Sequence, residues 1–249
     1  MSTWRSVLLT GAAGRIGSAF VAEFPARFQW RLADRETVSD APSGAETIRL
    51  DVVDPDACRA ACAGIDTVVH LAADPDPDAD FDDSLLNNNI RGTYNVFRAA
   101  KEAGCARVVF ASSVHAVFGY PFDVPVPVDG PVRPVNMYGV SKTFGEATAH
   151  AFAYSQGLSS IAIRIGAYEN DWIREAATPE NLSAYISPRD MNQLLVRAIE
   201  TPGVQFAIVH GISNNRVKRL SLDHTRALLG YEPVDDGFEI YRDYMTGAS

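Results

Sequence analysis

The stretch TGAAGRIG at residues 10–17 decides the fold of this chain. It follows SVLLT (residues 6–10), a short apolar run that is typical of a buried strand. It opens an amphipathic segment from Arg15 to about Glu23, which predicts a helix. A glycine-rich turn between a strand and a helix is how a βαβ unit begins, so the N-terminal part is expected to be an α/β structure.

The three glycines of this turn suit a dinucleotide pyrophosphate. Gly11 permits a tight turn, Gly14 lets the backbone approach a phosphate, and Gly17 lets the helix pack against the sheet. The N–H groups at the beginning of the helix, at Arg15 and Ile16, would point at the phosphates. The spacing G-x-x-G-x-x-G differs from the commoner G-x-G-x-x-G, and an ordinary strand–helix turn can also contain three glycines.

The second apolar run narrows the choice of cofactor. FQWRLAD (residues 28–34) predicts a strand that ends in Asp34. A carboxylate there can accept hydrogen bonds from both ribose hydroxyls of NAD, and it repels the 2′-phosphate of NADP. Arg35 could instead pair with that phosphate. The sequence therefore favours NAD, with NADP as the weaker alternative.

Strands and helices alternate along most of the chain. Strands are expected at 6–10, 28–34, 47–51, 66–72, 107–113 and 159–165, and helices at 15–23, 55–63, 82–103 and 137–156. This alternation predicts an α/β fold, a Rossmann-type doubly wound parallel sheet, for residues 1–166.

The remainder, residues 167–249, is expected to be a small C-terminal substrate-binding lid, integrated with the core as a single domain. Within it, Ser187-Pro188 reads as the beginning of a helix that ends near Glu200, and FAIVHG (residues 206–211) reads as a further strand.

The sequence YGVSK at residues 138–142 predicts acid–base chemistry. Tyr138 and Lys142 lie one helical turn apart, and an ammonium beside a phenol should lower the pKa of the phenol. Tyr138 could then remove a hydroxyl proton as a hydride leaves the same carbon. Ser113 ends the strand at 107–113, where its hydroxyl could bind the same substrate oxygen, whereas Ser112 should point the other way.

Composition excludes several classes of function. The formal net charge of −9 argues against nucleic acid as a partner, and no apolar run is long enough to span a membrane. The chain shows no signal peptide, and its three cysteines fit a reducing compartment, so a cytoplasmic location is expected. The histidines show no metal-ligand spacing, and Cys58 and Cys62 have no further ligand near them, so no metal site is expected.

Taken together, these motifs resemble the extended short-chain dehydrogenase/reductase family, the NAD-dependent epimerase/dehydratase group. TGAAGRIG, LDVVD, HLAA, NIRGTYNVFRAA, FASS and YGVSK follow one another in that family's order. The resemblance implies Ser113, Tyr138 and Lys142 as the catalytic set. It also implies further cofactor contacts: Asp51 and Val52 beside the adenine, Leu71, Ala72 and Ala73 along the adenosine ribose, and Asn89 near the cofactor or a relay water. Family members often form homodimers through the helices expected at 82–103 and 137–156.

Within the family, the chain is most similar to the uronate dehydrogenases, which oxidise C1 of a cyclic hexuronate to a lactone. The resemblance implies a sugar or sugar-acid substrate, with His115 and Arg174 as substrate-binding residues. Val114, Ala167 and Pro75 stand where those enzymes tend to carry polar residues. The resemblance therefore supports oxidation at C1 more strongly than specificity for a uronate. It leaves open which sugar and which anomer is the substrate, and what the oligomeric state is.

Two other functions use the same fold. A nucleotide-sugar epimerase or dehydratase shares the catalytic set, but generally needs a larger C-terminal region than residues 167–249. A non-catalytic dinucleotide-binding regulator typically loses the tyrosine or the lysine, whereas this chain keeps Tyr138 and Lys142.

Overall fold

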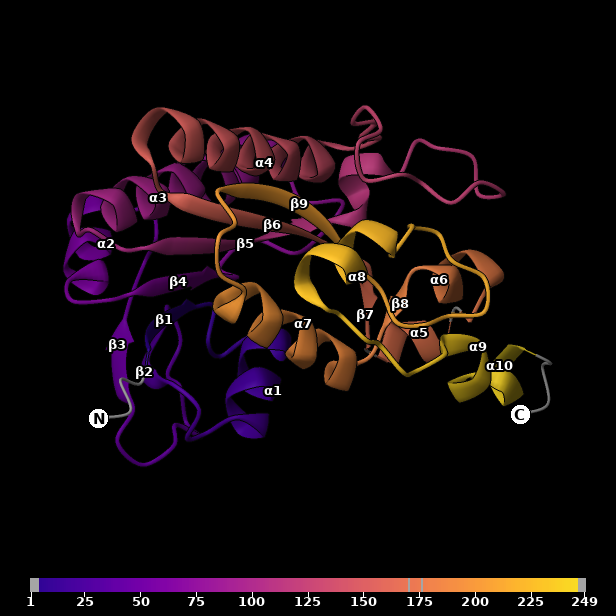
Figure 1. Cartoon of the computed structure of the whole chain (residues 1–249), viewed down its shortest axis with the longest axis horizontal. Helices are drawn as coiled ribbons and strands as arrows, with labels where there is room; N and C mark the ends of the chain where they lie inside the picture. The colour runs from indigo at the N-terminus through magenta and orange to yellow at the C-terminus, as the bar shows by residue number, and fades with distance from the viewer. Residues whose placement is uncertain (1–4, 170, 176, 246–249) are drawn as a thin grey trace.

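The computed structural model describes residues 5–169, 171–175 and 177–245, except for the side chains of Asp171 and Trp172. Its centre is a sheet of seven strands in the order β3-β2-β1-β4-β5-β6-β9, with every neighbouring pair parallel (Figure 1). The strands are β1 (Ser6–Thr10), β2 (Gln29–Asp34), β3 (Glu46–Arg49), β4 (Thr67–His70), β5 (Arg107–Ser113), β6 (Ser159–Ile165) and β9 (Phe206–Gly211). The strand order reverses between β1 and β4, the place where doubly wound sheets bind ligands. The predicted fold class is confirmed.

Helices cover both faces of the sheet (Figure 1). One face carries α2 (Pro55–Cys62), α3 (Gly92–Glu102) and α4 (Met137–Gln156), and the other carries α1 (Arg15–Glu23) and α7 (Pro188–Glu200). Each layer has its own apolar core, and the three cysteine thiols are free and buried in the core of the α2–α3–α4 side. Burial raises the pKa of the Cys58 thiol to about 12, so this thiol resists ionisation.

The segment expected as one helix at 82–103 is two helices. Residues Phe81–Arg91 wind as a π-helix, η1, and α3 follows from Gly92. The side chain of Asp80 caps η1 by accepting the N–H groups of Asp82 and Asp83. The apolar pattern could not distinguish the two windings, because both bury one face of the segment.

The C-terminal part forms short elements beyond the carboxyl ends of the strands (Figure 1). They are β7 (Ala167–Tyr168), α5 (Asp171–Glu175), α6 (Pro179–Ser183), β8 (Tyr185–Ile186), α8 (Asp223–Leu229), α9 (Gly237–Ile240) and α10 (Arg242–Met245). β7 and β8 pair in parallel as a separate small sheet. None of the described helices is long and apolar enough to cross a membrane. The expected homodimer stays a prediction.

A buried ion pair anchors α4 to the sheet. Glu146 on α4 accepts two hydrogen bonds from Arg164 on β6, at 2.8 and 2.9 Å, and one from the hydroxyl of Ser112 on β5, at 2.6 Å. The side chains of Arg164 and Glu146 are 1% and 4% exposed. Ser112 therefore contacts α4, and it also lines the same cavity as Ser113.

We predict that Glu146→Ala lowers the free energy of unfolding by about 3–5 kcal/mol, because it leaves the Arg164 guanidinium buried without its counter-charge. The matched control is Glu200→Ala, which removes a glutamate from the exposed pair with Arg27 and should cost no more than about 1 kcal/mol. Urea unfolding of both variants measures the difference. Equal effects would contradict the anchoring role, and Glu146→Gln supplies a milder variant if the alanine variant does not fold.

Candidate active site

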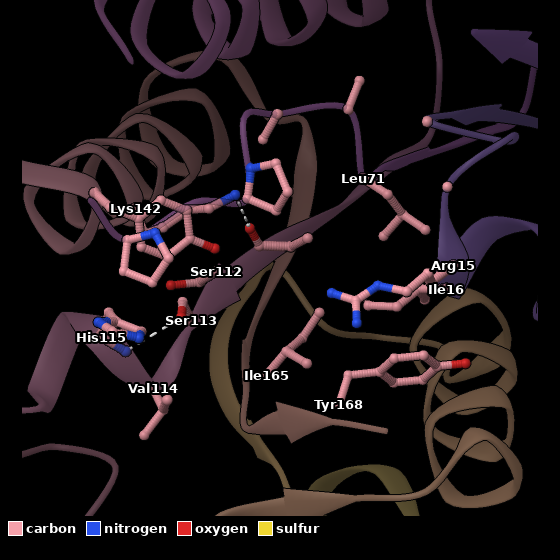
Figure 2. A pocket seen from close by; sticks show the side chains of 18 of the residues that line it. Arg15, Ile16, Leu71, Ser112, Ser113, Val114, His115, Lys142, Ile165 and Tyr168 are labelled. Carbon is pink, nitrogen blue, oxygen red and sulfur yellow. Dashed lines mark hydrogen bonds between the residues drawn. The ribbon is translucent and has the colours of Figure 1, made fainter. Parts of the chain in front are cut away.

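A cavity of about 970 Å³ opens at the carboxyl ends of the strands (Figure 2). Most of the residues predicted to bind cofactor or substrate lie in its wall: Gly11, Gly14, Arg15, Ile16, Gly17, Asp34, Val52, Leu71, Ala72, Ala73, Ser113, His115, Tyr138 and Lys142. Residues far apart in the sequence thus meet in one pocket, whose volume is at the upper end of the usual range for ligand sites.

The glycine turn has little room for side chains. Gly11 adopts φ = +74°, and a Cβ atom there would lie 2.8 Å from the backbone nitrogen of Ala72. A Cβ atom on Gly17 would lie 2.4 Å from the carbonyl oxygen of Gly11. The prediction for Gly17 needs correction, since the close contact is with the turn itself rather than with the sheet. Because Gly11 and Gly17 carry no side chains, the backbone of the turn lies next to the cavity.

The beginning of α1 presents free backbone donors to the cavity. Its N-cap, Gly14, carries no side chain to satisfy them, and the first turn holds no acidic residue. The first N–H groups of a helix lack partners within the helix and favour an anion. In Figure 2 the side chain of Arg15 also extends into the pocket, between Leu71 and Tyr168. This arrangement fits a pyrophosphate.

Asp34 stands at the end of β2 beside this turn. One carboxylate oxygen accepts the N–H of Ala13 at 2.9 Å, and the other accepts the N–H of Glu36 at 3.1 Å. Each oxygen can accept a further hydrogen bond, which fits the two hydroxyls of a ribose. Arg35 and Glu36 line the same end of the cavity and carry opposite charges.

Tyr138 and Lys142 project from α4 toward the end of β5. The Nζ atom of Lys142 donates to the carbonyl oxygen of Ala111 at 3.0 Å and lies 5.4 Å from the centre of the Tyr138 ring. Both side chains are buried, at 9% and 5% exposed for Tyr138 and Lys142. Ser113 is hydrogen-bonded to the Tyr138 phenol and also accepts the N–H of His115 at 3.2 Å. The three side chains of the expected catalytic set are therefore adjacent.

The pKa of Tyr138 differs from the expectation. Burial raises it to about 12, the hydrogen bond from Ser113 opposes that rise, and the charge of Asp74 adds to it. Burial also lowers the pKa of Lys142 to about 8, with Asp74 acting in the opposite direction. The expected lowering of the phenol pKa is thus wrong for the chain by itself, because the loss of solvent outweighs the nearby ammonium.

Three predicted residues do not line the cavity. Asp51 is exposed and its carboxylate accepts the N–H of Val53. The amide of Asn89 bonds both backbone groups of Asp74 and the hydroxyl of Ser141, so it fastens the loop after β4 instead of facing a ligand. Arg174 is exposed on α5, where its guanidinium interacts with Tyr241. In each case the polar group has a partner outside the pocket, which is near in sequence for Asp51 and distant for Asn89 and Arg174.

Arg219 is a cavity residue that sequence reasoning missed. Its guanidinium is buried and donates to the backbone oxygens of Phe118, Tyr120 and Pro121, and it lies over the ring of Phe122. Its Nε atom is buried without a hydrogen-bond partner among the described residues. Nothing local in the sequence marks this arginine, because its partners are about a hundred residues away. We call His115, Phe118, Phe122 and Arg219 the substrate wall.

The three departures from the uronate dehydrogenase pattern, Pro75, Val114 and Ala167, all lie in the cavity wall. Apolar side chains therefore line the cavity at three positions where the uronate dehydrogenases tend to carry polar residues. No cluster of three or more potential metal ligands occurs in the part of the chain that the structure describes.

The chain is similar to known sugar dehydrogenases. The chain is 37% identical to an NAD-dependent glucose-6-phosphate dehydrogenase of Haloferax volcanii, and the match covers 94% of each chain. It is 38% identical to an L-arabinose 1-dehydrogenase (NAD(P)(+)) of the same organism, and this match covers 92% of this chain and 96% of the relative. The solved structure of a mutant uronate dehydrogenase from Agrobacterium tumefaciens complexed with NAD is 30% identical, covers 98% of this chain and 90% of its own, and superposes with a TM-score of 0.87. The NAD dependent epimerase/dehydratase family model matches residues 7–186. The chain belongs to the NAD-dependent epimerase/dehydratase family, within the extended short-chain dehydrogenases/reductases.

Proposed function

We propose that this protein is an NAD-dependent sugar dehydrogenase that oxidises C1 of a cyclic sugar to a lactone. The observation that carries the proposal is the position of Tyr138, Ser113 and Lys142 in the same cavity as the glycine turn and Asp34. The relatives described above, which act on glucose 6-phosphate, arabinose and uronates, support a sugar as the substrate.

The cofactor end of the cavity is the part next to β1, β2 and α1. There Asp34 would bind the adenosine ribose, and the N–H groups at the beginning of α1, with Arg15, would bind the pyrophosphate. Val52, Leu71, Ala72 and Ala73 supply apolar wall beside them. The oxidised nicotinamide supplies an acceptor for a hydride when it is bound.

Tyr138 is the proposed proton acceptor. The hydroxyl proton on C1 moves to the phenolate oxygen while the C1–H bond breaks and its electron pair leaves as a hydride, so that a C=O bond forms. Ser113, whose single hydroxyl proton acts on Tyr138 in the chain by itself, would donate that proton in a hydrogen bond to the same substrate oxygen. Lys142 carries its charge below a pKa of about 8, which favours the phenolate and offsets part of the effect of burial.

The substrate wall favours a sugar that carries an acidic group. Arg219 is buried and, among the described residues, its guanidinium donates to backbone oxygens rather than to a carboxylate, so its charge is weakly screened by solvent. Of the four described acidic residues in the cavity wall, Asp34 and Glu36 lie at the cofactor end. The other two, Asp78 and Glu180, are exposed, so their repulsion is screened more strongly. We therefore propose a carboxylate or phosphate on the substrate, near Arg219.

We expect Tyr138→Phe to abolish sugar-dependent formation of NADH while leaving the dissociation constant for NAD nearly unchanged, because only the phenol oxygen is removed. Absorbance of the reduced cofactor measures turnover, and fluorescence titration measures binding. Ser113→Ala serves as the companion variant with a smaller loss. Substantial turnover by Tyr138→Phe would rule out this proton acceptor, and turnover without net NADH would favour an epimerase or dehydratase.

Cofactor choice is expected to depend on Asp34. The variant Asp34→Ala should weaken NAD binding and narrow the preference over NADP, since it removes both the ribose acceptor and the charge that repels a 2′-phosphate. The matched control is Asp51→Ala, because Asp51 lies outside the cavity wall. A wild-type protein that prefers NADP would contradict the proposal and implicate Arg35.

The proposed acidic group on the substrate is tested by measuring KM of Arg219→Met for glucuronate and for neutral glucose. We expect KM for glucuronate to rise about tenfold or more and KM for glucose to change little, since a hydrogen bond to a charged group contributes about 1.5–3 kcal/mol. Arg174→Ala should alter neither KM. Equal losses on both sugars in Arg219→Met would mean that the arginine only shapes the loop at 118–122.

A further inference from the structure

The ring of His115 is held in one plane at the substrate end of the cavity. His115 lies on η2 (Val114–Val117), the short 3-10 helix that follows β5. Its ring stacks on Phe118 with 4.9 Å between centres and 7° between planes, and it meets the Tyr138 ring edge-on at 5.4 Å. Two aromatic contacts therefore fix the plane of the ring.

Asn136 determines the role of one of those nitrogens. Asn136 is the N-cap of α4, and its Oδ1 atom accepts the N–H of Gly139 at 2.8 Å. A backbone N–H can only donate, so this contact assigns the oxygen of the amide and leaves Nδ2 to face His115 Nδ1, at 3.1 Å. An amide nitrogen can only donate as well. The Nδ1 atom of His115 must therefore accept, and the ring proton must be on Nε2.

The surroundings of His115 favour the same neutral form. Burial lowers its pKa, and the charge of Asp78 opposes this. Two further titratable or charged groups near the ring are the Tyr138 phenol, on α4, and Arg219, which donates to the backbone oxygen of Phe118. Among the described residues, Nε2 has no hydrogen-bond partner, and His115 lines the cavity. The N–H on Nε2 is the donor that remains for a ligand.

We infer that Asn136 is a positioning residue that holds His115 as a neutral Nε2–H donor, which binds an acceptor oxygen of the substrate beside Ser113 and Tyr138. The inference rests on the proposed function for the identity of the ligand, but the protonation state stands without it. It also explains why a histidine beside the reacting hydroxyl does not compete as a base. One nitrogen already carries the proton, and the lone pair of the other is bound by Asn136.

The variant Asn136→Asp tests this directly. An aspartate still caps α4 with one oxygen, but its second oxygen can only accept, so it forces a proton onto Nδ1 of His115. The matched control, Asn136→Ser, keeps a preferred N-cap residue but is too short to hold the imidazole. Nitrogen-15 NMR of the imidazole, in protein saturated with NAD and assigned by His115→Gln, reports which nitrogen is protonated.

We expect the wild-type ring to be protonated on Nε2 alone at about pH 8, and the ring of Asn136→Asp to be protonated on Nδ1 or on both nitrogens. We also expect kcat/KM of Asn136→Asp to fall about tenfold at that pH, as for loss of one hydrogen bond. The loss should shrink below the raised pKa of His115, where the imidazolium again donates from Nε2. For Asn136→Ser, kcat/KM should fall by a smaller factor, and its pH dependence should be that of the wild type.

A wild-type ring protonated on Nδ1 would overturn the inference. The inference would also be overturned if the fall in kcat/KM of Asn136→Asp were independent of pH and no larger than the fall in Asn136→Ser. A purely structural role of the cap predicts that result. If no sugar gives NADH but the NMR result is as expected, the proposed function fails while the assignment of the His115 proton stands.

Discussion

The geometry of the cavity depends on the ion pair between Glu146 and Arg164. Tyr138, Lys142 and Glu146 occur at intervals of four residues on α4, so they share one face of the helix. Glu146 binds β5 and β6 together through Ser112 and Arg164, while Lys142 bonds a carbonyl oxygen of β5. A buried ion pair contributes little net stability over an apolar pair, but a displaced partner is costly. That penalty keeps α4 in register with the strand that carries Ser113.

Burial at this face has opposite effects on the two titratable groups. It raises the pKa of Tyr138 and lowers that of Lys142, so both shifts favour the neutral forms. A buried lysine whose Nζ atom donates, among the described residues, to a backbone oxygen alone destabilises the folded state. Such a group is expected where function requires it, because perturbed pKa values gather at functional sites.

The substrate wall is assembled from two distant parts of the chain. His115 follows β5, Phe118 and Phe122 belong to the loop after it, and Arg219 comes from the C-terminal part. Arg219 holds the loop through backbone oxygens, and the loop is further paired to the same segment between Val126 and Leu220. The C-terminal part therefore shapes the pocket by fixing a loop of the core as well as by covering it.

The sequence by itself predicted most elements of the core and several residues that line the cavity. Strand β5 at 107–113, β6 at 159–165, α4 at 137–156 and the capped helix α7 at 188–200 have the predicted bounds, because apolar periodicity, N-caps and glycines act between near neighbours. The glycine turn, Asp34 and the Tyr138–Lys142 pair were recognisable for the same reason. Only the tertiary structure decided which other polar residues reach the cavity and how they ionise. Asn89 and Asp51 are held by backbone groups, Arg174 lies at the surface and Arg219 lies in the wall. These outcomes, like the raised pKa of Tyr138, depend on burial and on partners distant in sequence, which no local pattern encodes.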